Sequence, residues 1–268
     1  MSTDSISPTE RVITRIDSAI GWLIFNNPAK RNALSLDMWQ AIPAVLDRFE
    51  TEPAIRAVVL RGAGEQAFTS GADVSEFERL RGTPAEQARY NTISEAALTR
   101  LQQFPKPTIA MVQGYCMSIG LGIALACDLR FAGSSARFAS LAARLSLTYR
   151  WSDIKKLIDL IGPAHTKDFF YSARHVSADE ALAMGLIENV RPDAEIEAFT
   201  RAYCARIAEN APLSMTATKR IVAELIKPSS EIDRGLCKAI VASCYASEDY
   251  IEGRRAFMEK RKPIFKGK

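Results

Sequence analysis

The chain has 268 residues, 47% of them hydrophobic and 25% charged, and its formal net charge is +4. These values are typical of one large globular domain, or of a core with a small appendage. The mild charge and the lack of a dense Lys/Arg face before the C-terminal end argue against a nucleic-acid partner. No apolar run approaches the roughly 18 residues of a membrane span, so we expect no membrane partner.

Five cysteines without C-x-x-C spacing argue against both a disulfide framework and a zinc site. Only two histidines leave little scope for metal ligation or a histidine-based triad. The N-terminus has neither a positive n-region nor an apolar h-region, so no secretory signal is expected. We therefore expect a cytoplasmic protein with reduced, mostly buried thiols and no bound metal.

The N-terminal third predicts a hairpin and an amphipathic helix. After a polar tail over residues 1–10, two β-rich runs, 11–16 and 19–25, flank a turn. Ser35 can cap a helix whose apolar positions recur at intervals of 3, 4 and 3, namely Trp39, Ile42, Leu46 and Phe49. Pro43 lies inside this pattern, and we expect it to kink the helix or to shift its start.

The middle of the chain alternates between predicted strands and helices. Residues 55–60 read as a buried strand, and residues 75–100 as mostly helical, loosened at 81–84 by Gly and Pro. Residues 108–112 form a second buried strand, after which Gly120 and Gly122 precede an apolar helix-like segment at 123–127. A strand, a glycine turn and an apolar helix can present free backbone N–H groups, although a tightly packed corner would look the same.

The last third changes from mixed structure to helices alone. Residues 129–132 and 187–190 read as strands, Asp153 can cap a helix over 154–160, and Ser177 with Glu180 forms a capping box. From residue 193 onward the pattern is helical, interrupted at 211–212 and 228–230. We therefore predict an α/β core over residues 11–192 and a helical region over residues 193–268.

Several short blocks stand out along the chain: N-P at 27–28, S-G-A-D at 70–73, G-Y at 114–115, C-D at 127–128 and E-K-R-K at 259–262. In this order, over a stretch that starts at about residue 12, they resemble the crotonase superfamily, the enoyl-CoA hydratase/isomerase family of lyases and isomerases of fatty acid metabolism. The resemblance implies an α/β spiral of ββα units with a C-terminal helical trimerisation region. It also implies an acyl-CoA substrate, a homotrimer or dimer of trimers, and no cofactor besides the coenzyme A of the substrate.

The resemblance also places two backbone donors for the thioester oxygen, an oxyanion hole. By alignment of the blocks they are the N–H groups of Ala72 and Ile119. The segment G-Y-C-M-S-I-G stands where the family usually has G-Y-A-x-G-G-G, so Ile119 replaces a glycine. A β-branched residue can still donate its N–H, but it narrows the allowed backbone angles and adds bulk beside the thioester.

The family's hydratases add water with two glutamates, one as general base and one as general acid. The corresponding positions are Gly122 and Ala142, and a third acid position used by some relatives is Arg150. Several polar or aromatic residues near these positions are candidates to substitute for the glutamates, and each has a purely structural role as the alternative. They are Ser118, Arg144, Tyr149, Arg150, Asp153 and Glu76. Asp153 and Glu76 lead as acid/base candidates, because burial can tune a carboxylate toward neutral pH.

For the nucleotide half of coenzyme A, the resemblance points to cations, to one loop and to the C-terminal helix. The residues are Lys30, Arg31, the backbone of Ala72, Asp73, Val74 and Ser75, and the C-terminal Phe257 and Lys260. Two hypotheses remain open. The chain is either an enzyme that processes acyl-CoA thioesters through an enolate, or a non-catalytic acyl-CoA-binding protein on the same fold.

Overall fold

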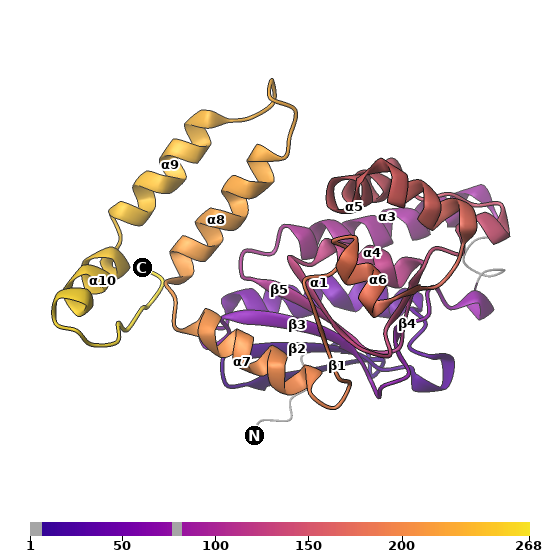
Figure 1. Ribbon diagram of the computed structural model, residues 1–268, viewed down its shortest axis with the longest axis horizontal. Coiled ribbons are helices and arrows are strands. Elements are labelled where there is room, and N and C mark those ends of the chain that lie inside the picture. Colours follow the sequence, from indigo (N-terminus) through magenta and orange to yellow (C-terminus); the bar gives the residue numbers. More distant parts are fainter. Residues whose placement is uncertain (1–6, 77–81) are drawn as a thin grey trace.

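The computed structural model describes residues 7–76 and 82–268 (Figure 1), so the first six residues of the predicted tail lie outside it. The larger sheet has six strands in the order β1 (Val12–Asp17), β2 (Ile20–Phe25), β3 (Ala57–Gly62), β5 (Thr108–Val112), β7 (Leu129–Gly133) and β10 (Asn189–Arg191). The smaller sheet has four, in the order β4 (Ala67–Thr69), β6 (Tyr115–Met117), β8 (Arg137–Ala139) and β9 (Val176–Ser177). Both sheets are parallel apart from the predicted hairpin β1–β2 and the pair β8–β9.

Helices connect and cover these strands. The α-helices are α1 (Leu36–Thr51), α3 (Pro84–Gln102), α4 (Ile119–Ala126), α5 (Trp151–Ser172), α6 (Ala178–Ala183), α7 (Ile196–Ala208), α8 (Pro212–Leu225), α9 (Arg234–Tyr245) and α10 (Glu248–Met258). Short 3-10 turns lie at η1 (Pro28–Lys30), η2 (Val74–Glu76) and η3 (Ala142–Leu145). The alternation of parallel strands and helices confirms the predicted α/β class.

The larger sheet separates two hydrophobic clusters. Along β3, Val58 and Leu60 face the cluster that also buries one side of α1, whereas Val59 faces a smaller cluster. The smaller cluster includes Ile196 and Cys204 of α7, which covers the opposite face of the sheet (Figure 1). This period-two division explains why the central strands read as continuous apolar runs, since both of their faces are buried.

Helix α1 shows packing overriding a local preference. Its predicted apolar positions are buried, and the helix begins directly after Ser35 and continues through Pro43 to Thr51. The expected shift of the helix start at Pro43 is therefore wrong. Each fully buried large side chain on this face, such as Trp39 and Phe49, contributes about 1.5–3 kcal/mol, enough in sum to offset a proline cost of roughly 3 kcal/mol.

The starts of α4 and α5 differ from the predictions, and the predicted break before α3 is confirmed in part. Helix α4 begins at Ile119, so Gly120 and Gly122 lie inside it rather than before it. Helix α5 begins at Trp151, so Asp153 lies in its first turn and does not cap it. The predicted break at 81–84 is confirmed in part, because α3 starts at Pro84 behind a Thr83–Glu86 capping box, while residue 81 lies outside the described chain.

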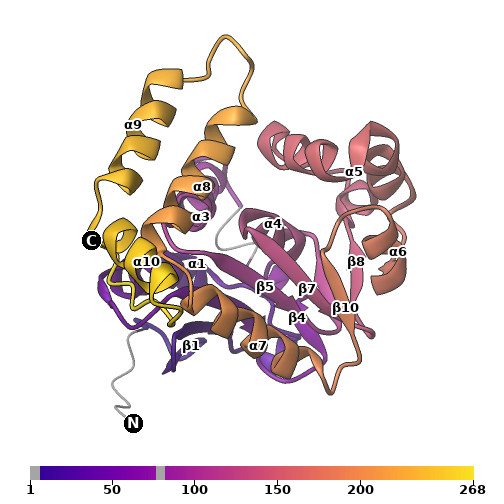
Figure 2. The ribbon, with the colours of Figure 1, turned by 60° about the vertical axis from the view of Figure 1, so that its left-hand side comes forward.

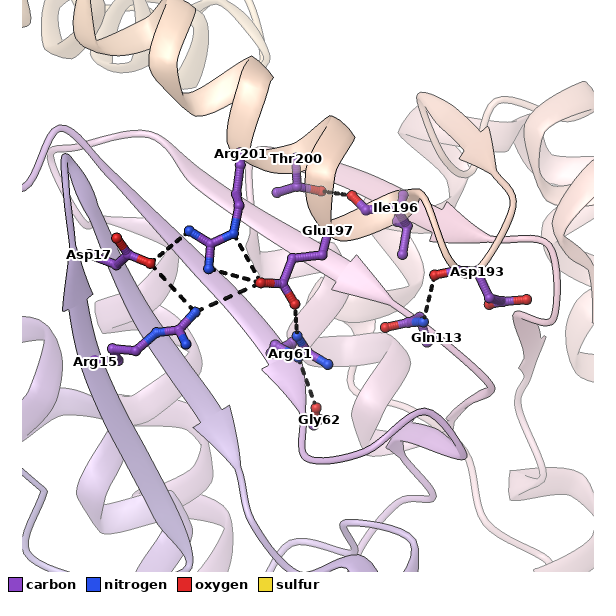
Figure 3. Close-up of polar contacts among 10 residues, drawn as sticks. All are labelled: Arg15, Asp17, Arg61, Gly62, Gln113, Asp193, Ile196, Glu197, Thr200 and Arg201. Carbon is purple, nitrogen blue, oxygen red and sulfur yellow. Dashed lines mark hydrogen bonds and ion pairs between the residues drawn. The ribbon is translucent and has the colours of Figure 1, made fainter.

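Helix α7 is fixed to the sheet by polar contacts, which Figure 3 shows. Arg201 contacts Asp17 of β1 at 2.7 Å, and Glu197 accepts a hydrogen bond from Arg61 of β3 at 2.6 Å. The ion pairs are partly exposed, so each contributes no more than about 1 kcal/mol. Their effect is to set the register of α7 on the sheet. The helices that follow it, α8 to α10, extend away from the strands in both Figure 1 and Figure 2.

Candidate functional site

A cavity of about 430 Å³ lies where α3, α4, η3 and the start of α5 meet the loop after β4; we call it the central cavity. Its lining includes Gly71, Ala72, Val74, Ser118, Ile119, Gly122, Ala142, Tyr149, Arg150 and Asp153. Most of them come from the blocks that the sequence singled out. The structure therefore brings the S-G-A-D loop, the start of α4 and the segment after β8 together at one place.

Two glycines allow the chain to make this approach. A Cβ on Gly120 would lie 2.4 Å from Thr69 Cγ2, so only glycine lets α4 pack directly on β4. Gly114 has φ +61, and a Cβ there would lie 2.0 Å from the carbonyl oxygen of Gln66. A side chain at Gly120 would push α4 away from β4, and one at Gly114 would push the start of β6 away from the segment before β4.

Two backbone N–H groups of the cavity wall have no acceptor. Leu34 donates to Gly71 O and accepts from Asp73 N, both at 2.8 Å, so the intervening Ala72 N–H points away from Leu34. Ile119 is the first residue of α4, where the N–H has no partner within the helix. Within residues 7–76 and 82–268, no oxygen accepts from either N–H. Both N–H groups belong to residues that line the central cavity.

Gly122 and Ala142 bring no carboxylate to the central cavity. An ideal Cβ built on Gly122 has no described atom within 4 Å, so a side chain there would enter open space. Ala142 lies in η3 and is 7% exposed. The two positions line the same cavity, and neither methyl nor hydrogen can transfer a proton.

Asp153 is the acidic candidate that the structure does place in the cavity wall. Arg150 Nε donates to its Oδ2 at 3.2 Å, and Lys156 Nζ lies 4.0 Å from its Oδ1. Burial lowers the pKa of Lys156, and the attraction of Asp153 opposes that shift. Asp153 therefore belongs to a compact charge cluster with a neighbouring cation for each oxygen.

Glu76, the other acidic candidate, has a different place. Its Oε2 accepts a hydrogen bond from Leu36 N at 3.0 Å, at the N-terminus of α1. A carboxylate there satisfies one of the free N–H groups of the helix and is stabilised by the helix dipole. Glu76 is not among the residues that line the central cavity, and its observed contact is with α1.

Of the predicted coenzyme A residues, those of the S-G-A-D loop lie beside the cavity. Lys30 Nζ donates to Asp73 Oδ2 and to Ser75 Oγ, each at 2.7 Å. Burial would raise the pKa of Asp73, but the hydrogen bonds from Lys30 and Ser75 outweigh it and hold that pKa below its usual value. Arg31 instead lies over the ring of Tyr115, 5.3 Å from its centroid. Lys30 and Ser75 thus stabilise the loop that carries Ala72.

The chain does not bring Phe257 and Lys260 to its own central cavity. Phe257 is 83% exposed and lines a separate groove among α8, α9 and α10, and Lys260 follows α10 at the surface. In Figures 1 and 2, α10 lies at the far end of the helical extension from α5. Neither residue lines the central cavity of its own chain.

Tyr149, one of the nearby residues that the sequence analysis named, lines the central cavity. Its ring does pack edge-on against Phe170, with the centroids 4.9 Å apart. Its hydroxyl, however, is buried and has no hydrogen-bond partner among the described residues. No local sequence pattern indicates that the hydroxyl of this tyrosine is buried without a hydrogen-bond partner.

Within residues 7–76 and 82–268, no group of three or more His, Cys, Asp or Glu is arranged to hold a metal ion. Over the same part of the chain, no helix has the length and apolar character needed to cross a membrane.

Comparison with known proteins places the site in a family. The family model for enoyl-CoA hydratase/isomerase matches residues 15–268. The chain is 30% identical to the short-chain-enoyl-CoA hydratase of Clostridium acetobutylicum over 94% of this chain and 95% of that one. It is 29% identical to the peroxisomal Delta(3,5)-Delta(2,4)-dienoyl-CoA isomerase of Arabidopsis thaliana, over 99% of each.

A solved structure extends this similarity to the fold. An enoyl-CoA hydratase/carnithine racemase from Magnetospirillum magneticum superposes with a TM-score of 0.91 at 31% identity, over 98% of both chains. This likeness confirms the crotonase-like fold that the sequence blocks predicted, with a helical C-terminal region. The chain belongs to the enoyl-CoA hydratase/isomerase family, within the crotonase superfamily.

Proposed function

We propose that the chain binds an acyl-CoA thioester in the central cavity and stabilises the thioester enolate. The observation that carries the proposal is the pair of unpartnered N–H groups of Ala72 and Ile119 in one cavity wall. When an α-proton leaves, or a nucleophile adds at C3, negative charge develops on the thioester oxygen. Two preorganised backbone donors in a cavity of low dielectric stabilise that charge more than they stabilise the ground state.

The same cavity argues against classical hydration as the main reaction. Gly122 and Ala142 stand where the family's hydratases have glutamates, so water has neither a base nor an acid beside it. Asp153 is the proposed substitute for a proton-transfer group, because it is a carboxylate in the wall of the cavity. Glu76 has the weaker case, since its carboxylate contacts α1.

For the coenzyme A half, the proposal uses the loop of residues 72–75 and nearby cations. Lys30 holds the Asp73 and Ser75 side chains of this loop, and its remaining exposed surface can meet a phosphate. Arg31 lies next to it in the chain, with its guanidinium over the ring of Tyr115. That the chain needs no cofactor beyond its substrate, and that it is cytoplasmic, stay predictions.

The alternative is a non-catalytic acyl-CoA-binding protein, which the loss of carboxylates at Gly122 and Ala142 favours. Two measurements separate the alternatives. Calorimetry with butyryl-CoA tests binding, and a panel of enoyl-, dienoyl- and β-ketoacyl-CoA thioesters tests turnover. The enzyme hypothesis predicts binding with turnover of at least one panel member. Binding without any turnover would support the alternative, and no binding would contradict both.

We further propose that α8 to α10 mediate assembly into a trimer or a dimer of trimers. A groove of about 890 Å³ lies among these helices. Apolar side chains at or near it are unusually exposed, including Val241, Ile251, Phe257 and Met258 at 44%, 64%, 83% and 80%. Such a surface is typical of a protein interface, and one repeated contact can close a ring. Phe257 and Lys260 would then reach a neighbour's coenzyme A site.

Sedimentation at micromolar concentration should give three or six times the monomer mass of 29.5 kDa. Met258→Asp should weaken the assembly, because it places a charge in the apolar groove, whereas Ile16→Asp on β1 should not. A wild-type monomer that binds butyryl-CoA tightly would contradict both the assembly and its part in binding.

A further inference from the structure

Ser118 is the single residue between strand β6 and helix α4, and its backbone conformation is unusual. Its φ is +49° and its ψ is −109°. This combination lies outside the left-handed helical region, where most non-glycine residues with positive φ are found, and it is costly for a residue with a Cβ. Strain of this kind persists where the surrounding structure fixes the chain, and it clusters at functional sites.

The backbone contacts of Ser118 explain why the chain turns so sharply here. Its N–H donates to the carbonyl of Ala139 in β8 at 2.8 Å, and its own carbonyl accepts from Gly122 N in α4 at 3.2 Å. One residue therefore converts the chain from strand to helix. Because the peptide group is planar and trans, the N–H of Ile119 points opposite to the Ser118 carbonyl, away from α4.

A strand, a strained serine and a helix form the nucleophile elbow of many serine hydrolases, and the arrangement is recognised by geometry on unrelated folds. There, the N–H after the serine is one oxyanion donor and a second loop supplies the other. Here Ile119 follows Ser118, and Ala72 supplies the second N–H from its own loop; all three residues line the central cavity. Gly120, two positions after the serine, lets α4 pack directly on Thr69.

The surroundings of the Ser118 hydroxyl favour negative charge on its oxygen. Leu141 N donates a hydrogen bond to Oγ at 3.3 Å, and such a bond favours the form that has lost its proton. Ser118 is also the N-cap of α4, where the helix dipole stabilises an anion. An ideal Cβ on Gly71 would lie 3.7 Å from Ser118 Cβ, so the serine lies beside the loop that carries Ala72.

We propose that Ser118 is a catalytic nucleophile, and that the chain hydrolyses acyl-CoA thioesters through an acyl-enzyme in which the acyl group is esterified to Ser118 Oγ. The inference rests on the proposed function only in that Ala72 and Ile119 hold the thioester oxygen. It adds a reaction that needs no carboxylate at Gly122 or Ala142.

The reaction has two steps. In the first, Ser118 Oγ bonds to the thioester carbon, and the negative charge moves to the carbonyl oxygen that the two N–H groups hold. Asp153, a carboxylate in the wall of the same cavity, takes the Oγ proton through a water molecule. It passes that proton to the sulfur of coenzyme A as the carbon–sulfur bond breaks.

In the second step, a water molecule adds to the ester carbon and gives a proton to Asp153. The proton returns to Ser118 Oγ as the carbon–oxygen bond to the serine breaks. The products are coenzyme A and a free carboxylic acid, and both Ser118 and Asp153 regain their starting forms.

The test incubates the wild type with butyryl-CoA, stops the reaction with acid and locates butyryl groups on the protein by peptide mass spectrometry. Released coenzyme A is measured by chromatography, because a thiol reagent would also react with the five cysteines. We expect a butyryl ester on Ser118 together with release of coenzyme A. Ser118→Ala should form no ester and should release coenzyme A at least about 10²-fold more slowly.

Ser118→Gly is the second variant, because glycine takes this positive φ without strain and cannot form the ester. Both variants keep the two free N–H groups, so both should still bind butyryl-CoA in calorimetry. Ser94→Ala is the matched control. Ser94 lines the same cavity from α3, with its Oγ donating to Asn91 O at 3.0 Å, and its replacement should leave the ester on Ser118 unchanged.

A wild type that binds butyryl-CoA without forming an ester on Ser118, or that is acylated only on cysteine, would overturn the inference and leave the proposed function intact. Release of coenzyme A by Ser118→Ala as fast as by the wild type would overturn it as well. Failure of the wild type to bind butyryl-CoA would instead overturn the proposed function and the inference with it.

Discussion

Replacing Gly122 and Ala142 together with glutamate should raise crotonyl-CoA hydration by several orders of magnitude above the wild type. A positioned acid or base contributes roughly 10² to 10⁴-fold, and the wild type has neither at these two positions. The cavity can accept the first side chain, because an ideal Cβ on Gly122 meets no described atom within 4 Å. Ala142 lines the same cavity. Hydration is measured by the loss of enoyl absorbance.

The matched control is the pair Gly122→Gln with Ala142→Gln, which adds nearly the same volume without a group that transfers protons. It should show no gain. Equal hydration by the glutamate and glutamine pairs would contradict the acid–base explanation. If neither pair gains activity while butyryl-CoA still binds, the β-branched Ile119 becomes the next position to replace, with glycine.

Replacing Ala72 with proline in the glutamate-containing double variant should lower kcat for hydration by about 10² to 10³-fold. This is the usual cost of removing one donor from an oxyanion hole. Proline removes only the N–H that is free, because the bridge to Leu34 uses Gly71 O and Asp73 N instead. The residue before it is Gly71, which has no Cβ to clash with the proline ring.

Ala72→Ser in the same background keeps the N–H and should retain most of the activity. Both variants are compared by thermal unfolding, so that a loss of activity can be separated from a loss of fold. An Ala72→Pro variant that folds and hydrates as fast as Ala72→Ser would show that this N–H does not stabilise the enolate.

Patterns within a few residues of the sequence were enough to predict some elements of the fold. The β1–β2 hairpin, the buried face of α1 and the Ser177–Glu180 capping box follow from side-chain period and capping chemistry within a few residues. The start of α4 did not follow from them, because Gly120 looks like a turn residue. It is glycine because α4 packs against Thr69, which is about fifty residues earlier in the chain.

The site was predictable where it depends on the backbone and not where it depends on tertiary neighbours. The resemblance led to Ala72 and Ile119, and the structure brings both to one cavity. The contact of Glu76 with Leu36 N joins residues 40 positions apart, and no local pattern could indicate it. The buried hydroxyl of Tyr149 likewise depends on Phe170 and on the two serines that surround it.

The structure of the complex with butyryl-CoA tests the central claim most directly, because it locates the thioester oxygen. The account predicts this oxygen in the central cavity, within about 2.7–3.1 Å of both Ala72 N and Ile119 N. A thioester bound outside the central cavity, or one whose oxygen contacts neither N–H, would contradict it.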